Sequence, residues 1–405
     1  AQSIVSWEWL VLLVLLPLFW FPENWRGLIL LLIPFLWLLR KVVTGRFFPA
    51  TPDDMAILVV VIAVLISFTA VFDIELSFPK IAGLMLGIAL FFAGVQHGRG
   101  IPKGSYYLLS GIFITGSGLA LAGLLASLEN PFFRFLNPAL ADSSRIWHDL
   151  PLIGGLTVNP NQLAGMLCWI VPLLAACTIG LWQARAGWPS QWVAVLQLVL
   201  LAMLLINTFI LLATRSRGGI LSVLTALLTM LAIRFRWGKW LLLSVVLVVS
   251  SSIILTGLGV VTPVSVQWID GLGLEGRLEL WSSALNGLRE FPLTGLSMNG
   301  FRELVHIFYP MISISPVMDI SHAHNHLLQV GLDLGLPGLI AYLSLWIISA
   351  GMLWSAWHNS PSAPDRVFIL GLSGSLTAGW MFGLLDAIAL GAKPGFLWWL
   401  LLALV

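Results

Sequence analysis

The chain has 405 residues, of which 59% are hydrophobic and only 9% are charged, and its mean hydropathy is +0.97. Soluble globular proteins contain about 45–50% apolar and about 25% charged residues, so this composition excludes a soluble globular protein and indicates an integral membrane protein. The formal net charge of +2 decides little, because the position of each charge relative to the membrane spans carries the information.

Apolar segments that approach the length of a membrane span recur along the chain. They predict an all-α polytopic membrane protein with about 12 transmembrane helices, since one span needs about 20 mainly apolar residues. The first two segments are short and are joined by Pro22-Glu23-Asn24, so they form either two spans or a hairpin that does not fully cross. The segments cover residues 8–22, 25–39, 55–72, 81–96, 105–128, 160–183, 192–213, 218–233, 240–261, 335–357, 367–387 and 394–405.

The charged turns suggest an orientation for these spans. With a cytoplasmic N-terminus, the short basic turns at residues 97–103 and 234–239 face the cytoplasm, as the positive-inside rule requires. The longer polar stretches 129–159 and 262–325 then lie outside, and residues 277–290 have the spacing of an amphipathic helix. The predicted units are therefore nine spans in 1–261, an exterior helical subdomain in 262–325, and three spans in 326–405.

Basic residues on the predicted exterior are mostly arginines, whose guanidinium groups bind phosphate or carboxylate in a bidentate manner. Arg215 and Arg217 stand beside Gly218 and Gly219, where a helix is predicted to begin. A helix start attracts anions through its unpaired N–H groups and its positive dipole end. This segment is therefore a candidate phosphate cradle, and a simple basic turn is the alternative.

Arg277 also stands near the start of a predicted helix, where a positive charge opposes the helix dipole. An anion should offset that cost. The candidates are Glu275, Glu279 or a bound ligand.

Three histidines, His322, His324 and His326, lie within five residues just ahead of a hydrophobic segment. They suggest a metal site together with Asp319, a structural cluster, or a general base, for which one histidine suffices. The spacing matches none of the common zinc motifs. The chain contains no Asp-x-Asp pair to hold a Mg²⁺- or Mn²⁺-bound diphosphate, so arginines would have to neutralise such a group.

Several motifs together resemble the O-antigen ligase and O-antigen polymerase superfamily. They are SRGG at 216–219, GRLELW at 276–281, FPLTGLSMNGF at 291–301 and HAHNHLLQVGLDLGLPGLIAYL at 322–343. The segment Asn159-Pro160-Asn161, followed by LAG at 163–165, is similar to a further stretch of the family. The resemblance covers about half of the chain, in matching order.

The resemblance implies a GT-C-type, inverting glycosyltransferase of the bacterial inner membrane whose active site faces the periplasm. Such enzymes move a glycan from undecaprenyl diphosphate to a hydroxyl of lipid A-core or of another glycan, and the ligases use no metal. It implies membrane lipids as surroundings, no cofactor and no nucleic-acid partner. No signature in the chain separates a ligase from an O-antigen or exopolysaccharide polymerase.

The resemblance also assigns roles to residues of this chain. His324 falls on the family's catalytic histidine, and Arg217 and Arg277 fall on its essential arginines, with Arg215 as a near neighbour. Arg215, Arg217 and Arg277 are therefore expected to bind the substrate diphosphate. His326 departs from the family pattern as an additional histidine. The supporting positions are His322, Asn325, His326, Gly218, Gly219 and Trp281.

Two functions of other classes compete with this one. Some relatives of the superfamily have been described as inorganic-carbon transporters, but transporters usually carry ionisable residues at mid-bilayer. The predicted spans hold almost none, and Asp333 and Asp386 fall near span ends. The second competitor is a zinc-dependent membrane hydrolase that uses the three histidines.

Overall fold

The computed structural model describes residues 2–16, 30–126, 159–184, 190–257, 274–360, 362–388 and 390–405. Within these ranges all regular secondary structure is helical, which confirms the predicted fold class. The helices are α1 (Gln2–Ser6), α2 (Glu8–Val14), α4 (Leu32–Thr44), α5 (Asp54–Phe68), α6 (Ile74–Gly100), α7 (Gly104–Ala126), α9 (Pro160–Ala184), α10 (Ser190–Ala213), α11 (Arg217–Arg234), α12 (Arg236–Gly257), α13 (Leu274–Glu290), α14 (Phe301–Phe308), α15 (His326–Asn359), α16 (Ala363–Leu385), the 3-10 turn η4 (Lys393–Gly395) and α17 (Phe396–Leu402).

Seven helices of the described part, α6, α7, α9, α10, α11, α15 and α16, are long and apolar enough to cross a membrane. The protein is therefore a multi-pass membrane protein, whereas the predicted number of 12 spans is not confirmed. Four of the predicted spans correspond to helices that are shorter than a full membrane span. These helices are α2, α4, α5 and α17, with 7, 13, 15 and 7 residues. The predicted hairpin turn at 22–24, nearly all of the 129–159 loop and residues 258–273 lie outside the described residues.

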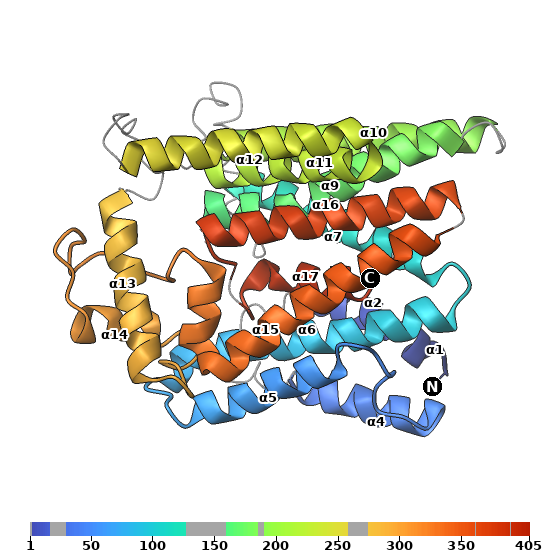
Figure 1. The fold of residues 1–405 in the computed structure, drawn as a ribbon. Coiled ribbons are helices and arrows are strands. Elements are labelled where there is room, and N and C mark those ends of the chain that lie inside the picture. Colours follow the sequence, from blue (N-terminus) through green and yellow to red (C-terminus); the bar gives the residue numbers. More distant parts are fainter. Residues whose placement is uncertain are drawn as a thin grey trace.

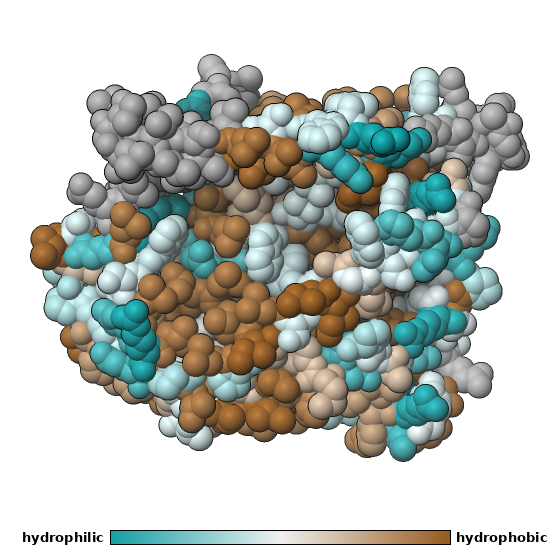
Figure 2. Space-filling model, in the orientation of Figure 1, coloured by the Kyte–Doolittle hydropathy of each residue, from teal (hydrophilic) through white to brown (hydrophobic). Residues whose placement is uncertain are grey.

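The long helices lie side by side in one bundle, and α13 and α14 lie together at one end of it, on the left of Figure 1. In the same view, Figure 2 shows hydrophobic residues gathered over the middle of the bundle and hydrophilic residues towards its two ends. That distribution suits a bundle whose middle faces lipid tails.

Small residues on α16 allow close packing against α9. Ser375 Oγ donates to the carbonyl oxygen of Trp169 at 2.6 Å, and Gly379 lies directly against the Trp169 indole. The small-residue spacing of Ser375 and Gly379 therefore serves helix packing, as expected for such positions in membrane helices. At the centre of the bundle, all seven residues of α17 are buried.

Helices α13 and α14 share a hydrophobic core of their own. The core extends to Leu332 of α15 and to Ala323, which stands between two of the clustered histidines. The backbone N–H of Leu296 donates to the carbonyl oxygen of Leu332 at 2.7 Å, which joins this subdomain to α15. Residues 322–326, which we call the histidine segment, are thus anchored between the subdomain and the bundle.

Helix α15 begins nine residues before the span predicted at 335–357. Asn325 caps it, because its Oδ1 accepts from the backbone N–H groups of Leu327 and Leu328 at 3.0 and 3.2 Å. Gly335 adopts φ 66°, and this kink separates a first helical piece from the main span. The first piece carries Gln329 and Asp333, whose polarity hides it from a hydropathy-based prediction.

Candidate functional site

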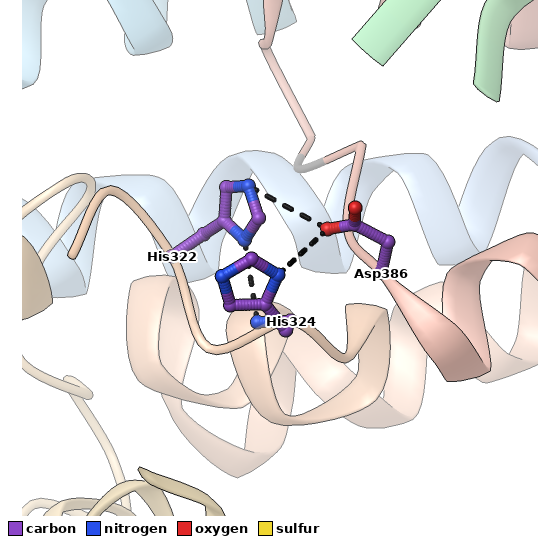
Figure 3. A group of neighbouring side chains, drawn as sticks. All are labelled: His322, His324 and Asp386. Atoms are coloured by element: carbon purple, nitrogen blue, oxygen red, sulfur yellow. Dashed lines mark hydrogen bonds and ion pairs between the residues drawn. The ribbon is translucent and has the colours of Figure 1, made fainter. Parts of the chain in front are cut away.

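His322, His324 and Asp386 meet where the segment before α15 approaches the end of α16 (Figure 3). His324 Nδ1 lies 3.1 Å from Asp386 Oδ1, and His322 Nε2 lies 3.7 Å from the same oxygen. The backbone N–H of Ala387 also donates to that oxygen, at 2.8 Å. All three side chains are 12% exposed or less. Asp386 was not among the site residues predicted from the sequence.

The charges of this group follow from its surroundings. Burial lowers the pKa of His322 to about 4, so this imidazole is neutral at neutral pH. Burial raises the pKa of Asp386, but the hydrogen bond from His324 and the attraction to both histidines outweigh it and bring the pKa to about 2. An ionised carboxylate only accepts hydrogen bonds, so His324 carries its proton on Nδ1. Proton uptake by His324 then falls to Nε2.

The backbone around His324 is held in a rare conformation. His324 has φ 47°, in the left-handed region that few non-glycine residues adopt. Trp281 Nε1 donates to the carbonyl oxygen of Ala323 at 3.1 Å, and the N–H of Ala323 donates to Gln329 Oε1 at 2.8 Å. Trp281, which was predicted as a supporting residue, thus contacts the histidine segment directly.

A small pocket borders Asp386 on the side of the arginines. The starts of α9, α11 and α13 and the end of α16 converge on it, so several helix N-termini and two guanidinium groups face one space. Ser216 caps α11, since its Oγ accepts from the N–H of Gly219 at 3.2 Å. The lining residues are Asn161, Ser216, Arg217, Gly218, Arg277, Phe382, Leu385 and Asp386.

Arg277 is 4% exposed and donates from its guanidinium group to the carbonyl oxygen of Leu385, the last residue of α16. A cation at a helix C-terminus is favourable, which offsets its cost at the start of α13. Glu279 has different partners, because its carboxylate accepts from the N–H groups of Ile312 and Ser313 at 2.5 and 2.7 Å.

The structure sets some predicted residues apart from this pocket. Arg215 is exposed, with φ 52°, and is not among the described residues that line it. Gly218 borders the pocket, whereas Gly219 packs against Ala164 of α9. Asn325 acts as the N-cap of α15.

His326 points away from the other two histidines. Its Nδ1 lies 2.8 Å from the Tyr342 hydroxyl, and its ring packs against Trp380 with the ring centroids 4.9 Å apart. Asp319 forms an ion pair with Arg302. The metal arrangement of three histidines with Asp319 is therefore not formed.

His322, His324 and Asp386 do offer one alternative for a metal ion. Their ligand atoms lie within 4.8 Å of one another, and two imidazoles with a carboxylate are a donor set that zinc accepts. The same three groups can instead serve proton transfer, because an imidazole oriented by a carboxylate is a common general base.

A larger cavity of about 570 Å³ lies on the other side of His322. Apolar residues of α6, α7 and α9 form much of its wall, and Ala387, the neighbour of Asp386, contributes to it. Its polar lining comprises Glu75, Lys80, Gln162, Asn299, Arg302, Ser321, His322 and Lys393. The histidine and aspartate group thus stands between a cationic pocket and a cavity of mixed polarity.

Residues 201–343, about a third of the chain, match the protein-family model described as O-antigen ligase. This part of the chain is therefore similar to the O-antigen ligase family. The resemblance inferred from the motifs is thereby confirmed, and the family implies a membrane glycosyltransferase-type enzyme that acts on lipid-linked glycans. No curated protein matches the chain. The matched segment contains every predicted site residue from Arg215 to His326 but ends before Asp386.

Proposed function

We propose that the protein is a metal-independent inverting glycosyltransferase that moves a glycan from undecaprenyl diphosphate to an acceptor hydroxyl, in the manner of an O-antigen ligase. The proposal places the reaction at the periplasmic face of the bacterial inner membrane. One observation carries it: His324, oriented by the carboxylate of Asp386, stands beside a pocket that holds Arg217 and Arg277.

The acceptor hydroxyl oxygen attacks the anomeric carbon of the donor sugar from the face opposite the diphosphate. His324 Nε2 takes the hydroxyl proton as the new C–O bond forms and the bond from that carbon to the diphosphate oxygen breaks. Asp386 holds Nδ1–H in place and stabilises the imidazolium that results. A positioned base of this kind contributes about 10²–10⁴ in rate.

The leaving diphosphate gains negative charge as its bond to the sugar breaks. Arg217 and Arg277 face the pocket together with the N-terminal turns of α9 and α11. Cationic and N–H groups that are fixed in advance stabilise such charge without reorganisation. The two guanidinium groups take the place that a divalent cation has in other diphosphate sites.

We assign the acceptor to the larger cavity, because His322 of the catalytic group lies on its wall. Its apolar walls and polar lining suit an amphipathic acceptor such as a glycolipid. Asn299 and Arg302, which belong to the proposed periplasmic subdomain 262–325, contribute to the lining. An O-antigen or exopolysaccharide polymerase would use the same donor chemistry, with a second lipid-linked glycan in this cavity.

The decisive experiment replaces His324 by Ala in the full chain, purified in lipid nanodiscs. The assay measures transfer of a radiolabelled trisaccharide from synthetic undecaprenyl diphosphate to rough lipopolysaccharide or to a second donor molecule. We expect a loss of about 10²–10⁴ in turnover, with the Kd for undecaprenyl diphosphate unchanged. His358→Ala is the control, because His358 lies at the opposite end of α15. Undiminished transfer by His324→Ala would refute the base assignment.

Metal analysis of the same preparation distinguishes a metal-independent transferase with His324 as the base from a zinc-dependent hydrolase. Stoichiometric zinc that disappears in His322→Ala, with activity that a chelator abolishes, would overturn the metal-independent mechanism. We expect transfer to persist in chelator.

A further inference from the structure

A buried ion pair joins α6 to the first piece of α15 close to the histidine segment. Lys80 Nζ lies 2.7 Å from Asp333 Oδ2, and the two side chains are 9% and 0% exposed. Asp333 Oδ1 also accepts from the backbone N–H of Asn299 at 3.2 Å and from Gln329 Nε2 at 2.9 Å. A buried ion pair adds little net stability when compared with apolar packing. Its effect is therefore expected in the positions of the groups that are bonded to it.

Gln329 connects this ion pair to the histidine segment. Its Nε2 donates to Asp333, and its Oε1 accepts from the N–H of Ala323 at 2.8 Å. Because the backbone N–H of Ala323 can only donate, the amide oxygen of Gln329 must face it, and the amide NH₂ group then faces Asp333 Oδ1. With the amide reversed, its NH₂ group would face the N–H of Ala323, donor against donor. Lys80 Nζ also lies 2.9 Å from Asp333 Oδ1, so it helps to hold the oxygen that accepts from Gln329 in place.

The peptide held by Gln329 is the one that sets the position of His324. Ala323 is hydrogen-bonded on both sides, from its N–H to Gln329 and from Trp281 to its carbonyl oxygen. The next residue, His324, has φ 47°. A non-glycine residue keeps such a conformation only where its surroundings hold it firmly.

We propose that Lys80, Asp333 and Gln329 form a positioning relay that holds His324 in reach of Asp386 and of the reacting hydroxyl. The proposal rests on the proposed function, in which His324 is the base. Gln329 and Asp333 act through the backbone of Ala323, so they are positioning residues and not catalytic ones.

The first test replaces Gln329 by Met, which has a similar length and no hydrogen-bonding amide. We expect turnover of the undecaprenyl diphosphate trisaccharide to fall by about 10- to 100-fold, because a shift of about 1 Å in a reacting group has that effect. The KM for this donor should stay within about twofold, since uniform binding is untouched. Gln197→Met is the matched control, because Gln197 of α10 bonds only the Thr178 carbonyl among its described partners. Equal turnover in the two variants would overturn the relay.

A second test separates positioning from stability. Two double variants, Lys80→Met/Asp333→Asn and Lys80→Met/Asp333→Leu, both remove the buried charges, but only Asn keeps an acceptor oxygen for Gln329. Both variants lack Lys80, so any effect of its loss on the acceptor cavity is common to the two. We expect turnover of the Asn double variant to exceed that of the Leu double variant by about 10- to 100-fold. Equal turnover of the two double variants at similar Tm would contradict the relay.

The outcome for His324→Ala keeps the two proposals distinguishable. If His324→Ala retains transfer, the proposed function fails. If His324→Ala is inactive while Gln329→Met is fully active, only the relay fails.

Discussion

Replacing Asp386 by Asn tests the pairing that the sequence did not reveal. Asn has nearly the shape of Asp, so the contact with His324 Nδ1 and the bond from the Ala387 N–H can persist. The change removes the negative charge that stabilises the imidazolium as the hydroxyl proton arrives. It also introduces an NH₂ group that can donate to Nδ1 and so move the imidazole proton to Nε2, the nitrogen that must accept.

The size of the effect follows from these two changes. Hydrogen bonds to charged groups contribute about 1.5–3 kcal/mol, against about 0.5–1.5 kcal/mol for neutral ones. The difference, about 1 to 1.5 kcal/mol, corresponds to about a tenfold loss of rate. If the tautomer changes as well, the whole contribution of the base is lost, about 10²–10⁴. We therefore expect a loss of at least about tenfold, and a smaller one in Asp386→Glu, which keeps the charge.

The assay is the nanodisc transfer reaction, with turnover and the Kd for undecaprenyl diphosphate measured separately. Asp365→Asn is the matched control, because Asp365 lies in the first turn of α16 and Asp386 directly follows its last residue. The control should behave as the unmodified protein. Full turnover in Asp386→Asn would show that His324 needs no carboxylate partner, and the proton assignment would then be wrong.

Three further predictions concern the arginine pocket, His322 and the SRGG motif. Arg217→Lys keeps the charge but not the bidentate geometry, so kcat/KM for the lipid-linked donor should fall by about tenfold or more. The control Arg234→Lys, at the other end of α11, should have no effect. Equal kcat/KM values for the two variants would exclude bidentate contact. Because the pKa of His322 falls from 6.5 to about 4, the unfolded chain binds a proton between these values that the folded chain refuses, and stability rises with pH across this window by up to about 3 kcal/mol. His322→Gln should reduce the difference in Tm between pH 4.5 and 7, and an unchanged difference would assign it to other groups. A Cβ at Gly219 would stand 2.8 Å from Ala164 Cβ, whereas one at Gly218 would stand 3.6 Å from Leu385 Cβ. Gly219→Ala should therefore lower the Tm, at a cost of about 1–3 kcal/mol in stability, while Gly218→Ala should leave the Tm unchanged. Equal Tm values for the two variants would contradict the packing.

The sequence predicted the long helices well because a span is a local property of composition and length. The predicted number of 12 spans stays a prediction, because hydropathy alone does not report how deeply a segment is buried in the bundle. The seven residues of α17 are as apolar as a span, yet they are buried inside the bundle. Asp333 and Gln329 had the opposite effect, since their polarity placed the start of α15 too late.

The grouping of residues at the candidate pocket could be predicted where the residues stand next to one another in one motif. Ser216, Arg217 and Gly218 stand together in the chain and at the pocket. Asp386 is 62 residues from His324, and only the packing of α16 against its neighbours brings them together. The available signal was a carboxylate at the exterior end of the span predicted at 367–387, and that position alone does not name a partner. His326 is close to His322 and His324 in the chain, yet its side chain points away from theirs. Proximity in the chain does not fix the direction of a side chain at a helix start.

The proton positions favour a base over a metal ion at these residues. The backbone N–H of His324 donates to His322 Nδ1 at 3.2 Å, so a neutral His322 carries its proton on Nε2, the nitrogen that faces Asp386. A metal ion between Asp386 and His322 would need that nitrogen deprotonated, with the proton moved to Nδ1. Nδ1–H would then face the N–H of His324, donor against donor, and the segment with φ 47° at His324 would have to change. Proton transfer at His324 Nε2 requires no such rearrangement, because Nδ1 already donates to an ionised carboxylate.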